Sequence, residues 1–171
     1  LWSDHGYEIG EKGTFGKHTL WSESTRVPLI IKLPKMKGGK KINNPVELLD
    51  LYPTLLELTN LTKNPLNEGK SLVSLINGKT EDSGLAITTY GMNNHSLINQ
   101  THRYIRYEDG SEELYNLIND PNERNNIANQ DGSSIIKRNF IRNIPSLNEP
   151  WSPSSYNTVN DYFIRTSNAE D

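Results

Sequence analysis

The segment SDHGYEIGEKGTFGKHTLW, residues 3–21, collects the side-chain types that active sites use. An aspartate and a histidine stand in tandem at Asp4 and His5, and a lysine and a histidine stand in tandem at Lys17 and His18. Four glycines separate the two pairs. The two residues before this segment are typical of a strand end, and open α/β sheets place their ligand sites at the carboxyl ends of strands. The pattern therefore predicts an active-site loop.

The composition excludes several classes of function for a protein with such a loop. The chain has 171 residues, which is enough for one ordinary domain, and 33% of them are hydrophobic, with a mean hydropathy of -0.70. The net charge is -3 and the basic residues are scattered, which argues against a nucleic-acid partner. No apolar run approaches the length of a membrane span. There is no cysteine, so the chain offers no disulfide and no thiol nucleophile.

The spacing of apolar residues divides the chain into two kinds of structure. Residues 27–33 are a β-branched apolar run typical of a buried strand, and helical spacing follows over 46–58 and 71–78. After Gly84 the spacing becomes that of strands, with a hairpin turn at 108–110. An amphipathic helix is expected over 134–144, and residues 146–171 are rich in Ser, Asn and Pro, typical of an irregular tail. These patterns predict an α/β portion over 1–80 and a small antiparallel sheet with a helix over 81–145.

Several segments in order resemble one enzyme family over roughly residues 1–145. They are SDHGYEIGEKGTFGKHTLWSESTRVPLII, LLDLYPTLLEL, EGKSL and YIRYEDGSEELYNLINDPNERNNIA. Together they resemble the C-terminal part of a formylglycine-dependent sulfatase, in the branch of the alkaline-phosphatase-like superfamily that includes iduronate and bacterial polysaccharide sulfatases. The resemblance implies an α/β core portion followed by a small antiparallel sheet with a C-terminal helix. The family's N-terminal acid pair and its Cys-x-Pro-x-Arg nucleophile segment are missing, so the resemblance implies an inactive fragment of a sulfatase.

The resemblance also implies roles for residues of the glycine-rich loop. Asp4 and His5 correspond to two ligands of a divalent metal, usually calcium in this family, and the formylglycine nucleophile is expected in the missing part. Coordination chemistry alone also admits magnesium, manganese or zinc. Lys17 corresponds to a lysine that contacts the sulfate, where a cation stabilises developing negative charge. The alternative is that Asp4 caps a turn and His5 lies at the surface; Lys12 has no family match and is expected to be a solvated charge.

Three further residues have two interpretations each. His18 is expected either to reach the leaving oxygen or the substrate, or to pack beside Trp21. His95 resembles a substrate-pocket histidine of some polysaccharide sulfatases, and otherwise is an exposed residue at a strand end. Arg103 is expected either to touch a carboxylated sugar or to belong to the polar face of an antiparallel strand.

The leading function is therefore a sulfuric ester hydrolase acting on sulfated carbohydrate, in the periplasm or outside the cell as the resemblance implies. A phosphodiesterase or phosphonate hydrolase of the same superfamily is the second hypothesis, because a shared fold does not decide the reaction. A non-catalytic homologue that binds glycans is the third. The nucleophile would separate the first two, since formylglycine favours sulfate and threonine favours phosphate.

Overall fold

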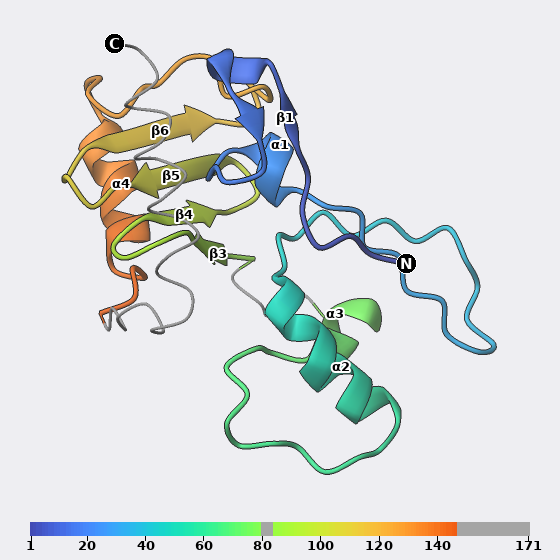
Figure 1. Ribbon diagram of the computed structural model, residues 1–171. Coiled ribbons are helices and arrows are strands. Elements are labelled where there is room, and N and C mark those ends of the chain that lie inside the picture. Colours follow the sequence, from blue (N-terminus) through green and yellow to red (C-terminus); the bar gives the residue numbers. More distant parts are fainter. Residues whose placement is uncertain (80–83, 147–171) are drawn as a thin grey trace.

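A computed structural model describes residues 1–79 and 84–146 of the chain (Figure 1). The predicted irregular tail, residues 146–171, lies outside the described residues apart from Ser146. The described chain forms a four-stranded sheet with a helix against it, and a second region of short helices and extended segments. The α/β fold class and the antiparallel sheet with its C-terminal helix are confirmed.

The sheet is a simple antiparallel meander in the order β3-β4-β5-β6. Its strands are β3 (Ala86–Thr89), β4 (His95–Ile98), β5 (His102–Arg106) and β6 (Glu112–Asn116). Gly110 adopts a φ of 84° in the turn between β5 and β6, a conformation that favours glycine. The expected hairpin turn at 108–110 is therefore confirmed.

One face of the sheet packs against α4 (Ser133–Ile141). Leu97, Tyr104 and Leu114 point to this face and are fully buried, and Phe140 of α4 packs against them. The rings of Tyr104 and Phe140 stack with their centroids 5.8 Å apart. Apolar burial on this face is thus what holds α4 to the sheet.

The opposite face is covered by the segment that carries the predicted active-site loop. Leu20 packs there with Ile105 and Tyr115, directly before α1 (Ser22–Thr25). In Figure 1 this segment, with β1 (Glu8–Ile9), lies at the end of the sheet away from α4. The loop is therefore packed onto the small sheet, although residues 1–80 and 81–145 are separate in the sequence.

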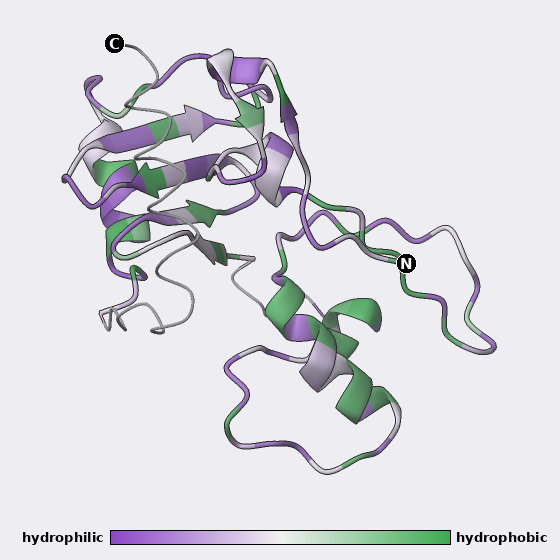
Figure 2. Ribbon diagram, viewed as in Figure 1, coloured by the Kyte–Doolittle hydropathy of each residue, from purple (hydrophilic) through white to green (hydrophobic). Residues whose placement is uncertain are grey.

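The helical region is built around α2 (Leu51–Leu58) and α3 (Val73–Ile76). A 3-10 turn, η2 (Leu48–Asp50), leads into α2, and Pro53 lies in the first turn of α2, where its missing N–H leaves no bond unmade. Gly78, with a φ of 88°, ends the helical segment as expected. Hydrophobic residues dominate α2 and α3 (Figure 2).

The expectation of a buried strand over residues 27–33 is wrong. Only Leu29 makes a ladder contact, an isolated antiparallel bridge to Trp2. Side chains of Leu29, Ile31 and Leu33 pack toward α3, whereas Ile30 is 60% exposed. The segment is extended, but no described strand flanks it to bury its second face. Over the described ranges, none of the helices is both long and apolar enough to cross a membrane.

Candidate active site

Short-range pairing folds the glycine-rich loop back on itself. Strands β1 (Glu8–Ile9) and β2 (Phe15–Gly16) are antiparallel, with Glu8 opposite Gly16. The base of the loop closes where the Gly6 N–H donates to the Ser24 carbonyl at 2.8 Å. A Cβ on Gly6 would lie 1.9 Å from the Glu23 carbonyl oxygen, so only glycine fits there. This folding returns the chain after β2 to the level of Asp4.

Asp4, His5 and Lys17 come together at the open side of this loop. The Asp4 Oδ2 lies 3.4 Å from the His5 Nε2, and the Lys17 Nζ lies 2.9 Å from the same nitrogen. Neighbouring side chains on an extended strand would point to opposite faces. Asp4 and His5 lie outside any strand, which lets both side chains converge. The structure thus places the three predicted residues in one cluster.

A hydrogen bond of His5 defines the tautomer of its ring. Its Nδ1 lies 2.8 Å from the Gly6 carbonyl, which only accepts, so Nδ1 carries the proton. In the neutral form of this tautomer the lone pair is on Nε2, the nitrogen that faces Asp4 and Lys17. A backbone carbonyl that fixes the tautomer in this way is a recurrent feature of metal-binding histidines.

The donor set fits part of a divalent metal site. A carboxylate and an imidazole nitrogen lie side by side, and the Asp4 and His5 side chains are 73% and 36% exposed, so both are accessible. Within residues 1–79 and 84–146, no three or more His, Cys, Asp or Glu side chains gather as a complete metal site. These two residues thus supply two ligands, and further ligands would have to come from elsewhere.

Electrostatics keep Asp4 in the form that binds a cation. Backbone N–H hydrogen bonds, its own first, lower the pKa of the Asp4 carboxyl, and the neighbouring Lys17 ammonium acts in the same direction. The ionised carboxylate is therefore favoured. Glu8, three residues after His5, behaves differently, because its complete burial raises the pKa of its carboxyl.

His18 lies next to the cluster in sequence but packs elsewhere. Its ring stacks on Tyr90 with the centroids 5.2 Å apart and the planes inclined by 10°. The predicted packing against Trp21 is therefore replaced by packing on Tyr90, at the end of β3. His18 remains solvent-exposed, so its proposed contact with a substrate stays a prediction.

The structure does not bring His95 into this cluster. His95 is 3% exposed, and its Nδ1 lies 2.9 Å from the Thr89 hydroxyl. It alternates with Ser96 on β4, and Ser96 faces the loop, so His95 shares the α4 face with Leu97. The expectation of an exposed strand-end histidine is wrong, and a substrate contact at His95 finds no support in this placement.

Arg103 is likewise an internal residue. It is 2% exposed, and its Nε lies 2.6 Å from the Glu123 Oε1 in an ion pair. Its NH1 donates to the Ser96 hydroxyl and to the Leu20 carbonyl at 2.7 and 3.0 Å. The expected surface cation that touches a carboxylated sugar is replaced by a buried ion pair between the sheet and the loop.

The sequence analysis missed two buried acids and the contacts of one lysine. Glu8 accepts a hydrogen bond from the Thr19 hydroxyl at 3.0 Å inside the loop. Glu123 binds Arg103. Lys12 is exposed, as expected, but its ammonium also donates to the Tyr115 hydroxyl at 3.0 Å. The burial of Glu123 has no local signal in sequence, because its partner Ser22 lies 101 residues away.

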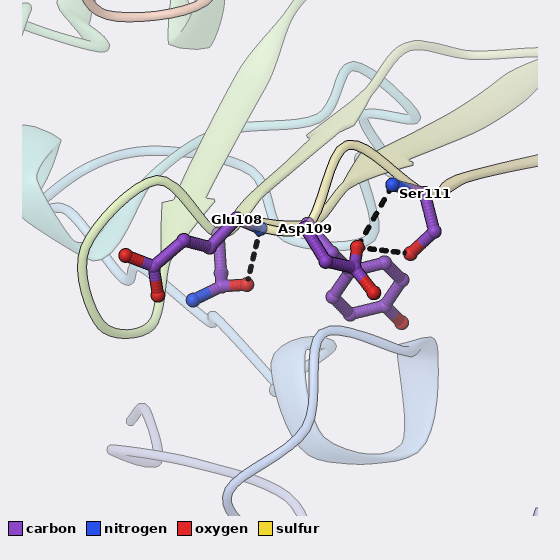
Figure 3. Close-up of a pocket in the computed structure, with 5 residues that line it drawn as sticks. Glu108, Asp109 and Ser111 are labelled. Carbon is purple, nitrogen blue, oxygen red and sulfur yellow. Dashed lines mark hydrogen bonds between the residues drawn. The ribbon is translucent and has the colours of Figure 1, made fainter.

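A hollow on the sheet lies between the turns that precede β4 and β6 (Figure 3). Its polar groups are largely satisfied within the turns. The Glu108 N–H donates to the Asn94 side-chain oxygen at 3.0 Å, and Asp109 accepts from the N–H and the hydroxyl of Ser111. None of the predicted site residues lines it. Its groups thus stabilise the turns.

Comparison with known proteins identifies the family. Residues 10–149 match the sequence model of the family described as N-sulphoglucosamine sulphohydrolase, C-terminal. The chain belongs to this sulfatase family. It is 46% identical over 168 residues to a sulfatase of Formosa agariphila, covering 96% of this chain and 32% of that protein. It is 32% identical over 141 residues to arylsulfatase K of Danio rerio, covering 75% of this chain and 27% of that protein.

Solved structures agree with this sulfatase fold. The crystal structure of a sulfatase from Bacteroides thetaiotaomicron matches with a TM-score of 0.74 and 23% identity, covering 97% of this chain and 36% of that one. A phosphonate monoester hydrolase of Agrobacterium radiobacter matches with a TM-score of 0.71 and 20% identity, covering 83% and 33%. The chain thus spans about a third of the length of its relatives. Its resemblance to a C-terminal sulfatase region is confirmed.

Proposed function

We propose that this chain supplies Asp4, His5 and Lys17 to the active site of a sulfatase that hydrolyses sulfate esters of carbohydrates. The observation that carries the proposal is the convergence of two charged groups on one imidazole nitrogen: the Asp4 carboxylate lies 3.4 Å and the Lys17 ammonium 2.9 Å from the His5 Nε2. Membership of the sulfatase family supports the reaction class.

A divalent cation, calcium by family resemblance, would be held by the Asp4 carboxylate and the His5 Nε2 in the complete enzyme. When bound, such a cation neutralises charge on the oxygens of a sulfate ester. The chain's own residues prepare this site, since Gly6 fixes the His5 tautomer and backbone N–H groups keep Asp4 ionised.

Lys17 would bind the sulfuryl group directly. Its ammonium, within 2.9 Å of the His5 Nε2, is close enough to donate to an oxygen of a sulfate bound at this cluster. A fixed cation near the oxygens that gain charge stabilises the transition state more than the ground state. The chain contains no cysteine, so the formylglycine nucleophile would belong to another part of the protein.

The carbohydrate substrate rests on the relatives. One structural neighbour, at a TM-score of 0.67 and 22% identity, is described in complex with its substrate D-glucosamine-2-N,6-O-disulfate. Another, at a TM-score of 0.63, is described in complex with a neocarrahexaose. A sulfated sugar is therefore the proposed substrate class, and a periplasmic or secreted location is proposed with it.

The test is the preference of the complete enzyme for sulfate over phosphorus esters. We expect faster hydrolysis of 4-nitrophenyl sulfate than of 4-nitrophenyl phosphate or phenylphosphonate, and sulfate release from sulfated disaccharides. The second candidate, a phosphonate or phosphodiester hydrolase, is favoured by the match to the Agrobacterium enzyme, which shows that the fold also serves phosphonate chemistry. Preference for the phosphorus esters would select that candidate.

A further inference from the structure

Glu123 contacts the active-site loop on both sides of Lys17. Its carboxylate accepts from the Ser22 N–H at 2.9 Å and from the Ser22 hydroxyl at 2.5 Å. Its backbone carbonyl accepts a hydrogen bond from the Lys12 ammonium. Lys12 lies five residues before Lys17 and Ser22 lies five residues after it. One residue of the small sheet region therefore holds both arms of the loop that presents Lys17.

The conformation of Glu123 is specialised for this position. Its side chain is 2% exposed, and its φ is 53°, in the left-handed region that residues other than glycine rarely adopt. Such strain persists only where the surroundings enforce it. Arg103 does so here, because its Nε pairs with the carboxylate at 2.6 Å and its NH2 donates to the Ser22 hydroxyl at 3.1 Å.

The Lys12 arm is fixed by aromatic rings as well as by Glu123. The Lys12 Nζ lies 4.9 Å from the Trp21 ring centroid and 4.6 Å from that of Tyr115, distances typical of cation–π contacts. The Trp21 Nε1 and the Tyr115 hydroxyl both donate at 2.7 Å to Glu113 on β6. Lys12 is thus held among groups that are themselves bonded to the sheet.

We propose that Glu123 is a positioning residue that, through Lys12 and Ser22, holds the loop so that Lys17 faces the bound sulfate. The role rests on the proposed function, because it acts through Lys17. In this role Glu123 and Lys12 act on the loop rather than on the substrate. We call the contacts of Glu123 with Lys12 and Ser22 the clamp. A displacement of about 1 Å at a reacting group is enough to slow catalysis by roughly a hundredfold, so a small shift of Lys17 on loss of the clamp would lower turnover.

A double-mutant cycle in the complete enzyme tests this role. Lys12→Met removes the ammonium but keeps an apolar stem between the rings, and it is combined with Lys17→Ala. If Lys12 acts through Lys17, Lys12→Met lowers kcat/KM for a sulfate ester by about tenfold when Lys17 is present, and by less than about twofold when it is alanine. The inhibition constant for inorganic sulfate should rise in parallel only when Lys17 is present.

The matched control is Lys137→Met, which breaks another ion pair to the sheet. The Lys137 Nζ lies 2.6 Å from the Glu112 Oε2 on the α4 side. This variant should leave kcat/KM within about twofold in both backgrounds. Glu123→Gln enters the same cycle and should repeat the pattern of Lys12→Met; if it does not fold, the Lys12 cycle decides.

An equal fall in kcat/KM from Lys12→Met in both backgrounds, or no fall in either, overturns the clamp while the proposed function stands. A Lys17→Ala enzyme with parental turnover overturns the proposed function itself, and the clamp with it. The two failures are therefore distinguishable.

Discussion

At the scale of single residues, substitution of Lys17 tests the proposed chemistry most directly. Lys17→Ala in the complete enzyme should lower kcat/KM for a sulfate ester by about a hundredfold, because a cation is lost beside the developing charge. Its melting temperature should change little, since Lys17 is exposed. Lys37→Ala, another exposed lysine, is the control and should retain parental kinetics. Parental kinetics for Lys17→Ala as well would remove Lys17 from the site.

Glu8 gives a prediction about pH. Burial raises the pKa of its carboxyl above the ordinary 4.5, so the folded state holds its proton at a pH where the unfolded state has lost it. Its contribution to stability is full below the unfolded pKa and is lost as pH rises through the folded pKa. Glu8→Gln should therefore gain stability relative to the parent as pH rises above about 4.5. Melting temperatures of both proteins against pH test this; a constant difference contradicts it.

Single residues also show why some sites were predictable and others were not. Asp4, His5 and Lys17 lie in one short loop, where residue type and spacing carry the signal. Arg103 has the same type as a sugar-binding cation, and only the position of Glu123, twenty residues further on, makes it an internal ion pair. Sequence patterns give residue types but not the partner that a fold supplies.

At the scale of elements, the closure between Gly6 and α1 sets the geometry of the site. Gly6→Ala would place a Cβ 1.9 Å from a backbone oxygen of Glu23, so a backbone shift is required. We expect a loss of about 1–3 kcal/mol of stability, as for other overpacked positions, together with reduced turnover. Gly38→Ala, where nothing lies within 4 Å of the added Cβ, is the control and should be nearly neutral. Equal stability of both variants, measured by thermal melts, would contradict the close packing.

The elements of the small sheet were predictable because alternation decides them locally. Successive side chains of β5 alternate between the two faces of the sheet: Tyr104 packs toward α4, and Ile105 packs toward Leu20 at the end of the loop. The prediction of a buried strand over residues 27–33 was wrong because an apolar run identifies an extended segment but not the neighbouring strands that would bury it. The packing of the loop on the sheet was also unpredictable, since it joins segments about a hundred residues apart.

At the scale of the whole molecule, apolar side chains lie open on the helical region. Leu49 and Leu55 are each more than half exposed there, as is Trp2 on the N-terminal segment that pairs with Leu29. Contiguous exposed apolar surface favours association. The isolated 171-residue chain should therefore self-associate on a sizing column. It should also show no turnover of aryl sulfates, because it has no cysteine that could become the formylglycine nucleophile. A monomeric elution profile with cooperative unfolding would contradict the first expectation, and metal-dependent turnover above a buffer blank would contradict the second.

The most direct test of the site is the metal content of the complete enzyme and of its Asp4→Asn and His5→Ala variants, measured by elemental analysis beside sulfate release. The two side chains lie 3.4 Å apart with the His5 Nε2 lone pair between Asp4 and Lys17, which is the arrangement that we assign to a divalent cation. We predict near-stoichiometric divalent metal in the parent and, in each variant that still folds, a loss of most of the metal together with sulfate release. Variants that keep full metal content and parental turnover would contradict the account.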